Sequence, residues 1–529
     1  MEVSKPENTE ENLLWHRRTL WVIGSLLVFR LCYLWLFPVG LVHDEAYYWD
    51  WSRSLDWGYY SKPPMIAWII AASTRMLGSS EYTVRLPAVL LATSGLYFIY
   101  LLTARMFSSR IGFWAVLLSA LTPGNVAMGL LMTIDAPFIF LWCAALYCFW
   151  RMLERDQHRL TWLLLTVCVI GLGVLTKQTM LGFLAFGGLF ILISKEDRKE
   201  LFQPGLWLCA LGSLIFLTPV LYWNWQNDWI TAQHTGEHFQ NESVDLSIRF
   251  LRSLEFLGGL LGVISPVTFV LTSIILVAGF WSIRNLGRKE KYLLCFSAIP
   301  LSLVLMLSFK QRIELNWPAA FFPAAMVLVA AWAHKQTSIK AWLTPQTYYL
   351  RNAAVVGAVF TCITYAMPFA IELFNLEGSK IDAVVRLRGW GELGDEISAE
   401  LKGLSLRDDT LFVVTAGRGV TAELTFYLEN QPKVYLWKDT TDITSQYDVW
   451  GGPRNAANRQ AVIVTNWDEP VPQGLASAFS SIRSISRVTV PINETRSLDF
   501  RIWLAEDCSA WPPNGTAVVA KDNLGSTHR

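Results

Sequence analysis

The sequence predicts a polytopic α-helical membrane protein with about eleven transmembrane helices and a soluble α/β domain at its C-terminal end. Of its 529 residues, 53% are hydrophobic and only 16% are charged, whereas about a quarter of the residues in soluble domains are charged. Apolar runs recur as far as residue 371, and a helix needs about 20 mostly apolar residues to cross a bilayer. Beyond them, β-rich runs alternate with helical periodicity, which favours one small α/β domain.

The first element, residues 1–18, is polar and acidic and lacks the short apolar core and cleavage site of a signal peptide. We therefore expect the first helix to be an uncleaved anchor. The segment 64–78 is apolar but short and ends near an arginine, so we expect an interfacial helix there. The expected spans are 19–41, 86–104, 111–131, 136–153, 160–176, 179–194, 205–223, 258–282, 292–309, 317–334 and 352–371.

The loops between these spans alternate in charge. One set carries most of the Lys and Arg, as in "HRR" (16–18), "WRMLERDQHR" (150–159) and "RNLGRKEK" (284–291). The positive-inside rule assigns this set, and the N-terminus, to the cytoplasm. The opposite set, which begins with the first outer loop at 42–85, lies on the outer side.

The outer side also receives everything after the last span. "TLFVVTA", "KVYLW", "AVIVTN" and "RVTVPI" predict strands there, and "ELGDEISAELKGL" and "VTAELTFYL" predict helices. We therefore expect a membrane domain at 19–371, an outer α/β domain at 372–510 and a flexible tail at 511–529.

Ionisable side chains gather on the outer side of the predicted membrane domain. Burying one at membrane depth costs roughly 2.5–3.5 kcal/mol, and each alone has an ordinary interpretation, because it can snorkel or form a salt bridge. Together they fit a phosphate-bearing substrate, since cations bind phosphate oxygens and a carboxylate accepts the proton of an attacking group. The set comprises Asp44, Glu45, Lys62, Arg85, Asp135, Lys177, Lys310, Arg312 and Glu314.

The stretch "HDEAYYWDWSRSLDWGYYSKPPMIAW" (43–68) begins this set and is crowded with aromatic residues. The aromatics fit either an interfacial belt or a surface on which a sugar stacks. The stretch resembles the first outer loop of the GT-C glycosyltransferases of the protein mannosyltransferase and lipid A aminoarabinose transferase superfamily (glycosyltransferase family 39 and its relatives). "SSEYTVRLPAVL", "MTIDAPFIFLW", "GVLTKQTMLGF" and "ELNWPAAFFPA" resemble later family segments in the same order, so the likeness covers about residues 19–370.

The resemblance implies an inverting transferase whose donor is a sugar on polyprenyl phosphate, expected to be undecaprenyl phosphate. Asp44 matches the family's acidic residue implicated as base, and Glu45 its neighbour. The donor phosphate would contact Lys62, Arg85 and Lys177. Asp135 would be an acceptor contact or a second acid. Independently of the resemblance, the position of Lys310, Arg312 and Glu314 in the sequence makes them candidate contacts at the outer rim.

Two departures from the family pattern limit what can be carried over. The aminoarabinose transferases have "DETRY" where this chain has "DEAYYW", so neither their sugar nor their acceptor is implied. The large luminal insert of the eukaryotic mannosyltransferases has no counterpart. A bacterial branch of the family fits best, which places the protein in the inner membrane with its outer side in the periplasm. The acceptor stays open among lipid A, another glycolipid, a glycan and a protein.

A zinc-peptidase pattern, H-x-x-E-H, occurs at "HTGEH" (234–238). His234 and His238 have a spacing that suits a metal, but Gly236 interrupts the pentapeptide and no third ligand is evident downstream. We expect a solvated loop helix, with a metal or substrate contact as the weaker alternative. No cofactor is firmly implied, and a divalent metal is optional.

A transporter or flippase of a lipid-linked sugar is the alternative from another class. Transporters place ionisable groups near the midplane, within inverted repeats, whereas the groups here lie at one face and no repeat is visible. A polysaccharide ligase or polymerase shares the donor but not the first-loop pattern. The net charge of +1 excludes an extended nucleic-acid surface.

Overall fold

The computed structural model describes residues 9–37, 39–237, 245–403 and 411–514. The chain divides into two compact units. The first, here the membrane unit, comprises Met1–Phe37 and Leu55–Met367; the second, here the C-terminal unit, comprises Pro38–Ser54 and Pro368–Arg529. Residues 1–8 and 515–529, within the predicted N-terminal segment and tail, lie outside the described residues, as does His238.

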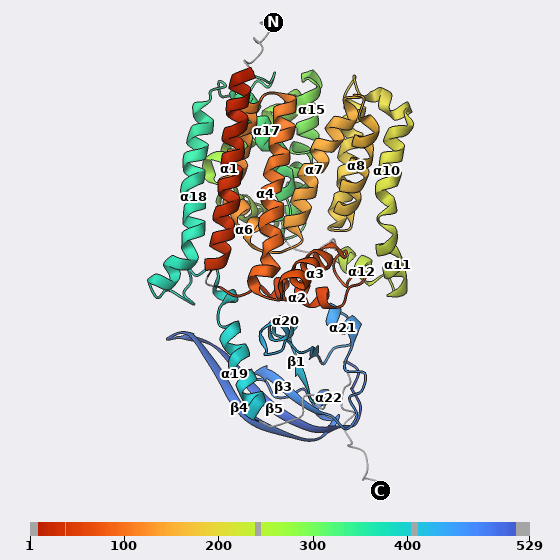
Figure 1. Ribbon diagram of the computed structural model, residues 1–529, viewed down its shortest axis with the longest axis vertical. Coiled ribbons are helices and arrows are strands. Elements are labelled where there is room, and N and C mark those ends of the chain that lie inside the picture. The colour runs from red at the N-terminus through yellow and green to blue at the C-terminus, as the bar shows by residue number, and fades with distance from the viewer. Residues whose placement is uncertain (1–8, 38, 238–244, 404–410, 515–529) are drawn as a thin grey trace. The chain divides into compact units, whose positions relative to one another are not determined.

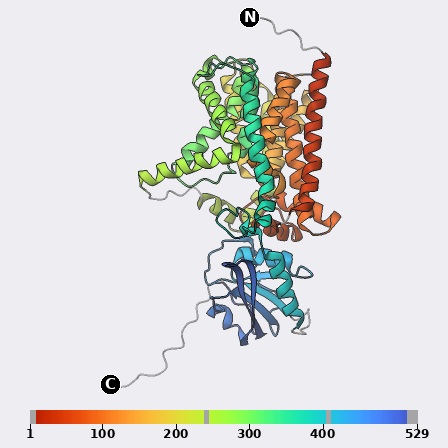
Figure 2. The same cartoon turned by 90° about the vertical axis from the view of Figure 1, so that its left-hand side faces the viewer.

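The membrane unit is helical, and Figures 1 and 2 show α1, α4, α7, α8, α10 and α18 running side by side along it. Its helices are α1 (Thr9–Leu36), α3 (Met65–Leu77), α4 (Glu81–Met106), α5 (Ser109–Ala120), α6 (Pro123–Leu130), α7 (Asp135–Leu153), α8 (Arg159–Val174), η1 (Gln178–Met180), α9 (Leu181–Ile193), η2 (Arg198–Phe202), α10 (Pro204–Ile215), α11 (Thr218–Gln226), α12 (Ile230–Glu237), α13 (Leu246–Ile264), α14 (Pro266–Ser282), η3 (Ile283–Asn285), α15 (Arg288–Cys295), α16 (Ala298–Ser308), η4 (Ala319–Phe321), α17 (Phe322–Ala333) and most of α18 (Tyr348–Leu373).

Seven helical segments are long and apolar enough to cross a membrane by length and composition, and the bent pair α5–α6 adds an eighth. Every one of the eleven expected spans falls on one of these eight or on the shorter apolar helices α8, α9 and α17. The polytopic helical fold is therefore confirmed, while the number of eleven crossings stays a prediction. The expected interfacial helix corresponds to α3, which has only 13 residues.

One predicted span has different limits. We expected one helix at 258–282, but the chain breaks at Ser265, whose φ is +73°, and residues 258–264 belong to α13. Pro266 begins α14 because proline disfavours helical geometry at the residue before it and fits the first position of a helix. Figure 2 shows α13 inclined to its neighbours and reaching out from the membrane unit.

The core of the membrane unit is built around α17, all twelve residues of which are buried. Five of the twelve are alanine, and small residues let membrane helices approach closely. Trp142 of α7 packs edge-on against Phe183 and Phe321 beside this helix, with ring centroids 5.1 and 5.2 Å away. A helix that is apolar on every side is stable only when surrounded, so the other helices enclose α17.

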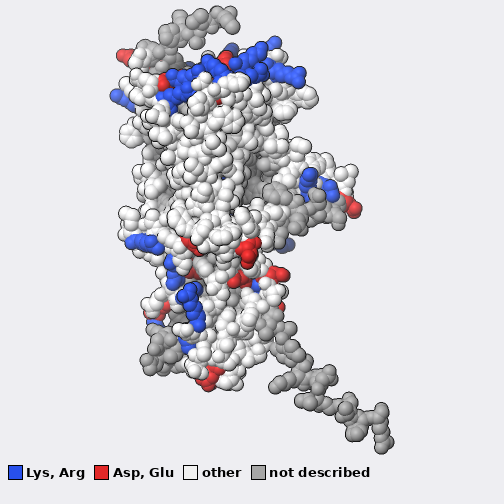
Figure 3. Space-filling model, turned by 90° about the vertical axis from the view of Figure 1, so that its right-hand side faces the viewer, with Lys and Arg blue, Asp and Glu red and all other residues white. Residues whose placement is uncertain are grey.

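Basic side chains mark one end of this unit. Figure 3 shows Lys and Arg gathered at the end where α1 begins, above a broad flank almost free of charge. Several belong to ion pairs between loops, including Arg159–Glu200 at 2.7 Å and Arg288–Asp197 at 2.9 Å. The predicted basic loops at 150–159 and 284–291 thus share one end.

A buried arginine stabilises the 75° bend between α5 and α6. Arg30 of α1 is fully buried; its guanidinium donates to the Asn125 carbonyl at 2.9 Å and to the Tyr365 hydroxyl at 3.0 Å. Gly129 leaves the room required, because a Cβ there would lie 2.6 Å from the guanidinium carbon. Backbone groups freed at a break in a membrane helix need such partners.

We expect Arg30→Met to lower the thermal stability of the detergent-solubilised protein, because the Asn125 carbonyl and Tyr365 hydroxyl would lose their donor. The cost should be about 1–3 kcal/mol. Arg17→Met, which changes an exposed arginine of the same helix, is the matched control. Equal melting temperatures for the two variants would contradict the assignment.

The C-terminal unit contains a five-stranded sheet of order β2-β1-β3-β5-β4. β1 pairs in parallel with β2 and β3, and β5 pairs antiparallel with β3 and β4. This confirms the predicted α/β class. The elements are α2 (His43–Arg53), η5 (Val385–Leu387), α19 (Trp390–Gly403), β1 (Leu411–Thr415), α20 (Arg418–Tyr427), β2 (Val434–Leu436), α21 (Gln446–Trp450), β3 (Gln460–Asn466), α22 (Gln473–Ala476), β4 (Phe479–Asn493) and β5 (Arg496–Cys508).

The helix α2 belongs to the C-terminal unit by its contacts, although it precedes it by more than 300 residues in sequence. The first outer loop, predicted as one piece at 42–85, is therefore divided after Ser54. Trp49 meets Phe426 edge-on at 4.9 Å, and Tyr47 packs against Tyr447 at 5.2 Å. Trp49 and Tyr47 are each only 1% exposed. These two rings therefore form neither an interfacial aromatic belt nor a surface on which a sugar could stack.

Candidate functional site

A buried ionic cluster lies in the membrane unit. Asp135, the first residue of α7, is 2% exposed. Its Oδ1 accepts from Lys177 Nζ at 2.8 Å and its Oδ2 from Asn316 Nδ2 at 2.6 Å. The structure thus brings two predicted residues, Asp135 and Lys177, into one ion pair. Because both carboxylate oxygens already accept a strong hydrogen bond, Asp135 is suited to hold Lys177 in place.

Each member of the cluster comes from a point where a helix begins or ends. Lys177 has an extended backbone between α8 and η1, and Asn316 lies in the segment between α16 and η4. The Lys177 ammonium also lies 5.3 Å from the centre of the Phe138 ring. Its side chain keeps 14% of its exposure, so the ammonium can meet a ligand without leaving Asp135.

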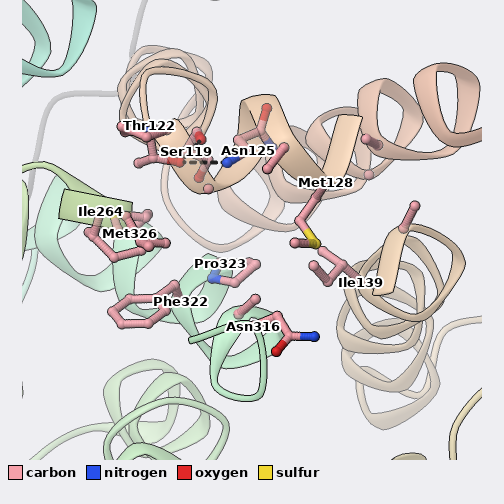
Figure 4. Close-up of a pocket in the computed structure, with 18 of the residues that line it drawn as sticks. Ser119, Thr122, Asn125, Met128, Ile139, Ile264, Asn316, Phe322, Pro323 and Met326 are labelled. Carbon is pink, nitrogen blue, oxygen red and sulfur yellow. Dashed lines mark hydrogen bonds between the residues drawn. The ribbon is translucent and has the colours of Figure 1, made fainter. Parts of the chain in front are cut away.

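An apolar cavity of about 480 Å³ adjoins this cluster. Its wall comes from α4, α5, α6, α7, α13 and α17, and Asn316 belongs both to the wall and to the ionic cluster. Figure 4 shows Phe322, Pro323 and Met326 along one side, with Asn316 near one end and Thr122 and Asn125 across the cavity. An apolar cavity that adjoins an ionic cluster through Asn316 fits an amphipathic ligand.

Lys62 and Arg85, the other predicted phosphate contacts of the membrane unit, lie in the segments that precede Asp135 in sequence. Lys62 lies in the turn before α3, where its carbonyl accepts the Tyr59 amide at 3.1 Å. Arg85, in α4, is 1% exposed and its guanidinium carbon lies 5.0 Å from the centre of the Phe37 ring. Their contact with a donor phosphate stays a prediction.

The predicted rim residues come from the segment after α16. Lys310, Arg312 and Glu314 are exposed, and Glu314 also lines the cavity. The sequence analysis did not single out Asn316, although it lies in the quoted stretch "ELNWPAAFFPA". An amide carries no charge, and no spacing links it to Asp135, so only the fold could show their contact.

The two adjacent acids of α2 have different surroundings within the C-terminal unit. Asp44 keeps 45% of its side-chain exposure, and its Oδ1 lies 3.3 Å from a guanidinium nitrogen of Arg418. Glu45 is fully buried, and its carboxylate accepts the Val42 amide at 3.0 Å, which completes the start of the helix. Of the two, Asp44 is the acid that an acceptor hydroxyl can reach.

Two further groups of α2 escaped the sequence analysis. His43 Nδ1 lies 2.8 Å from an Oε atom of the buried Glu423. Asp50 is 4% exposed, and burial raises its pKa to about 6, although Arg53, 3.7 Å away, opposes the rise. Arg53 lies three residues after Asp50 on the same helix, a pairing that local spacing allows, whereas the contact of His43 with Glu423 could not be assigned from spacing.

In the zinc-peptidase pattern, the ring of His234 packs against the ring of Tyr60. His234 of α12 has its Nδ1 3.0 Å from the Tyr60 hydroxyl, and the two ring centres are 4.6 Å apart. Within the described ranges, no three His, Cys, Asp or Glu side chains are grouped as metal ligands. A tyrosine contact explains the position of His234.

Comparisons with known proteins agree with this architecture. The family model for dolichyl-phosphate-mannose-protein mannosyltransferases matches residues 61–223. The lipid A galacturonosyltransferase RgtD of Rhizobium johnstonii is 27% identical over 422 residues, which cover 78% of this chain and 83% of that protein. The crystal structure of ArnT from Cupriavidus metallidurans aligns with a TM-score of 0.59 over 93% of this chain and 97% of that one, at 14% identity. The chain has the GT-C fold of ArnT, and its sequence is similar to those of membrane glycosyltransferases.

Further similarities are consistent with that assignment. The undecaprenyl phosphate-bound structure of ArnT aligns over 93% of this transferase and 98% of that chain with a TM-score of 0.58, at 16% identity. A putative mannosyltransferase of Bacillus subtilis, YycA, is 27% identical over 141 residues, which cover 26% of this chain and 20% of that protein. The fold predicted from sequence is confirmed, and the sequence similarities support the predicted transferase class.

The raised pKa of Asp50 predicts a pH dependence of stability. In the unfolded chain this carboxyl has an ordinary pKa of about 3.9, so the folded state binds the proton more tightly. The contribution of Asp50 to the free energy of unfolding is then greatest below about pH 4 and falls as the pH rises to about 6. The full loss is on the order of 3 kcal/mol.

We therefore expect Asp50→Asn to melt at a higher temperature than the wild type at pH 7.5, and the gap to narrow toward pH 4. Thermal unfolding of the full-length protein across this range measures both. Asp395→Asn, in the exposed part of α19, should show no such gap. A difference in melting temperature that widens toward acidic pH would contradict the raised pKa of Asp50.

Proposed function

We propose that this transferase moves a sugar from a polyprenyl-phosphate-linked donor to lipid A on the periplasmic side of the inner membrane. The observation that carries the proposal is the ionic cluster of Lys177, Asp135 and Asn316 at one end of an apolar cavity. A polyprenyl phosphate has the same two parts, a long apolar chain and a charged group at its end.

Donor binding follows from this match. The prenyl chain occupies the apolar cavity and its phosphate meets the Lys177 ammonium, which Asp135 and Asn316 hold in place. Lys62 and Arg85 supply further positive charge to the phosphate. The related ArnT has been crystallised with undecaprenyl phosphate, and we propose the same carrier here.

Asp44 acts as the base in this scheme. It accepts the proton of an acceptor hydroxyl as that oxygen attacks the anomeric carbon. The new bond joins the anomeric carbon to the acceptor oxygen, and the bond to the phosphate oxygen breaks with inversion. The leaving phosphate departs as an anion stabilised by cations, so the scheme requires neither a general acid nor a divalent metal.

Lipid A is the proposed acceptor because 78% of this chain is similar in sequence to a lipid A galacturonosyltransferase. The orientation rests on the basic end of the membrane unit (Figure 3), which the positive-inside rule places in the cytoplasm. By the same rule, the first outer loop and the segments after the last predicted span lie on the periplasmic side. The comparisons with glycosyltransferases do not favour a transporter.

We expect Asp44→Asn to abolish transfer, because the amide cannot accept the acceptor proton. The assay uses membranes supplied with polyprenyl-phosphate sugars, and mass spectrometry of lipid, protein and glycan fractions identifies the product. Asp468→Asn, an exposed carboxylate of the same unit, should keep full activity. Transfer by Asp44→Asn at the wild-type rate would remove Asp44 from the mechanism.

Lys177 allows a sharper test, because its charge both balances Asp135 and meets the donor. Lys177→Gln should raise the KM for donor by about tenfold or more, which corresponds to about 1.4 kcal/mol. It also leaves Asp135 buried without its cation. The double variant Lys177→Gln with Asp135→Asn removes that imbalance, so it should recover stability but keep the raised KM.

Lys199→Gln, an exposed lysine at the basic end, is the control for loss of one positive charge. If the double variant regains wild-type KM as well as stability, Lys177 serves only to neutralise Asp135 and the proposed donor contact is wrong. Addition of a chelator to the same assay tests whether transfer proceeds without a divalent metal.

A further inference from the structure

Within the C-terminal unit, α2 is held on α20 by a contact between His43 and the buried carboxylate of Glu423. Glu423 has no exposed surface and receives the His43 Nδ1 contact at 2.8 Å. The Leu41 amide donates to the Tyr427 hydroxyl at 2.8 Å, one turn farther along α20. Gly419 permits this approach, since a Cβ there would already be 3.2 Å from the His43 ring. The position of Asp44, next to His43, is therefore set by α20.

The same helix presents an arginine to the proposed base. Arg418 is the first residue of α20, and its guanidinium lies 3.3 Å from Asp44 and 5.1 Å from the centre of the Tyr47 ring. The Arg418 side chain is 48% exposed. The ring limits the orientation of the guanidinium plane, and much of its hydrogen-bonding edge remains accessible to solvent.

This environment suits an additional anion. A guanidinium has five N–H donors and binds a carboxylate best through two parallel hydrogen bonds. Its distance of 3.3 Å from Asp44 is longer than the 2.7–2.9 Å typical of strong charge-assisted bonds. Arg418 can therefore bind a second carboxylate beside Asp44.

We propose that Arg418 binds the carboxylate of the transferred sugar, so that the donor carries a hexuronic acid. This rests on the proposed function, in which Asp44 takes the acceptor proton. That proton neutralises Asp44 and would leave Arg418 without its anion, and a carboxylate on the sugar supplies one throughout the reaction. In a pyranose, the anomeric carbon and the carbon that bears the carboxylate share the ring oxygen, so a residue beside the base can reach it.

The similarity to a lipid A galacturonosyltransferase supports the same sugar class. The C-terminal unit then has a defined part in the reaction: through Arg418 it selects the donor sugar, and through Glu423 and His43 it positions the base. Neither role could be assigned to this domain from its place in the sequence.

The test compares two synthetic donors on the purified full-length protein, polyprenyl-phosphate galacturonic acid and the matching neutral galactose donor. Arg418→Gln should lower kcat/KM for the uronosyl donor by about 10- to 100-fold more than for the neutral donor, mainly through KM. Arg418→Lys should retain part of the preference, because it keeps the charge but loses the two parallel bonds. Arg483→Gln, an exposed arginine of β4, should behave as wild type.

Other results would overturn the proposal in distinguishable ways. An equal fall for both donors in Arg418→Gln, at unchanged melting temperature, would show that Arg418 acts only on Asp44. Unchanged kinetics with both donors would remove Arg418 from the site. A wild type that prefers the neutral donor would overturn the sugar assignment alone, whereas no transfer from either donor would overturn the proposed function and with it this inference.

Discussion

A carboxylate buried at membrane depth needs a cation or strong hydrogen-bond donors, and Asp135 has both. Its pairing with Lys177 and Asn316 joins the start of α7 to two chain segments that lie far away in sequence. In a low-dielectric environment, loss of either charge leaves the other uncompensated. Asn316 also lines the apolar cavity, so the interaction that holds the segments together lies beside the place where we propose that the donor lipid binds.

The same principle recurs at Arg30 and at Glu423. Each is fully buried, and each links segments remote in sequence: Arg30 holds the bend between α5 and α6, and Glu423 holds α2 on α20 through His43. Polar contacts of this kind fix the relative position of elements that apolar packing alone would allow to slide. They are therefore found where the fold must place a particular side chain.

Much of the fold could be predicted because the relevant signals are local. Each of the eleven predicted spans falls on apolar helices, and Pro266 marked a break that we overlooked because hydropathy continues across it. The predicted strands match β1, β2, β3 and part of β4. β5 was not predicted, although its alternation of apolar and polar residues, with Arg501 and Asp499 among them, is typical of a half-exposed strand.

Local chemistry in the sequence determined the class of protein, the apolar helices, the charge asymmetry of the loops and the candidate residues Asp44, Asp135 and Lys177. Only the tertiary structure decided which of these meet. The Asp135–Asn316 contact spans 181 residues and the His43–Glu423 pair 380. Such contacts depend on how helices pack and not on spacing along the chain. Only the fold could therefore show that α2 belongs to the C-terminal unit and that Arg418 contacts the proposed base.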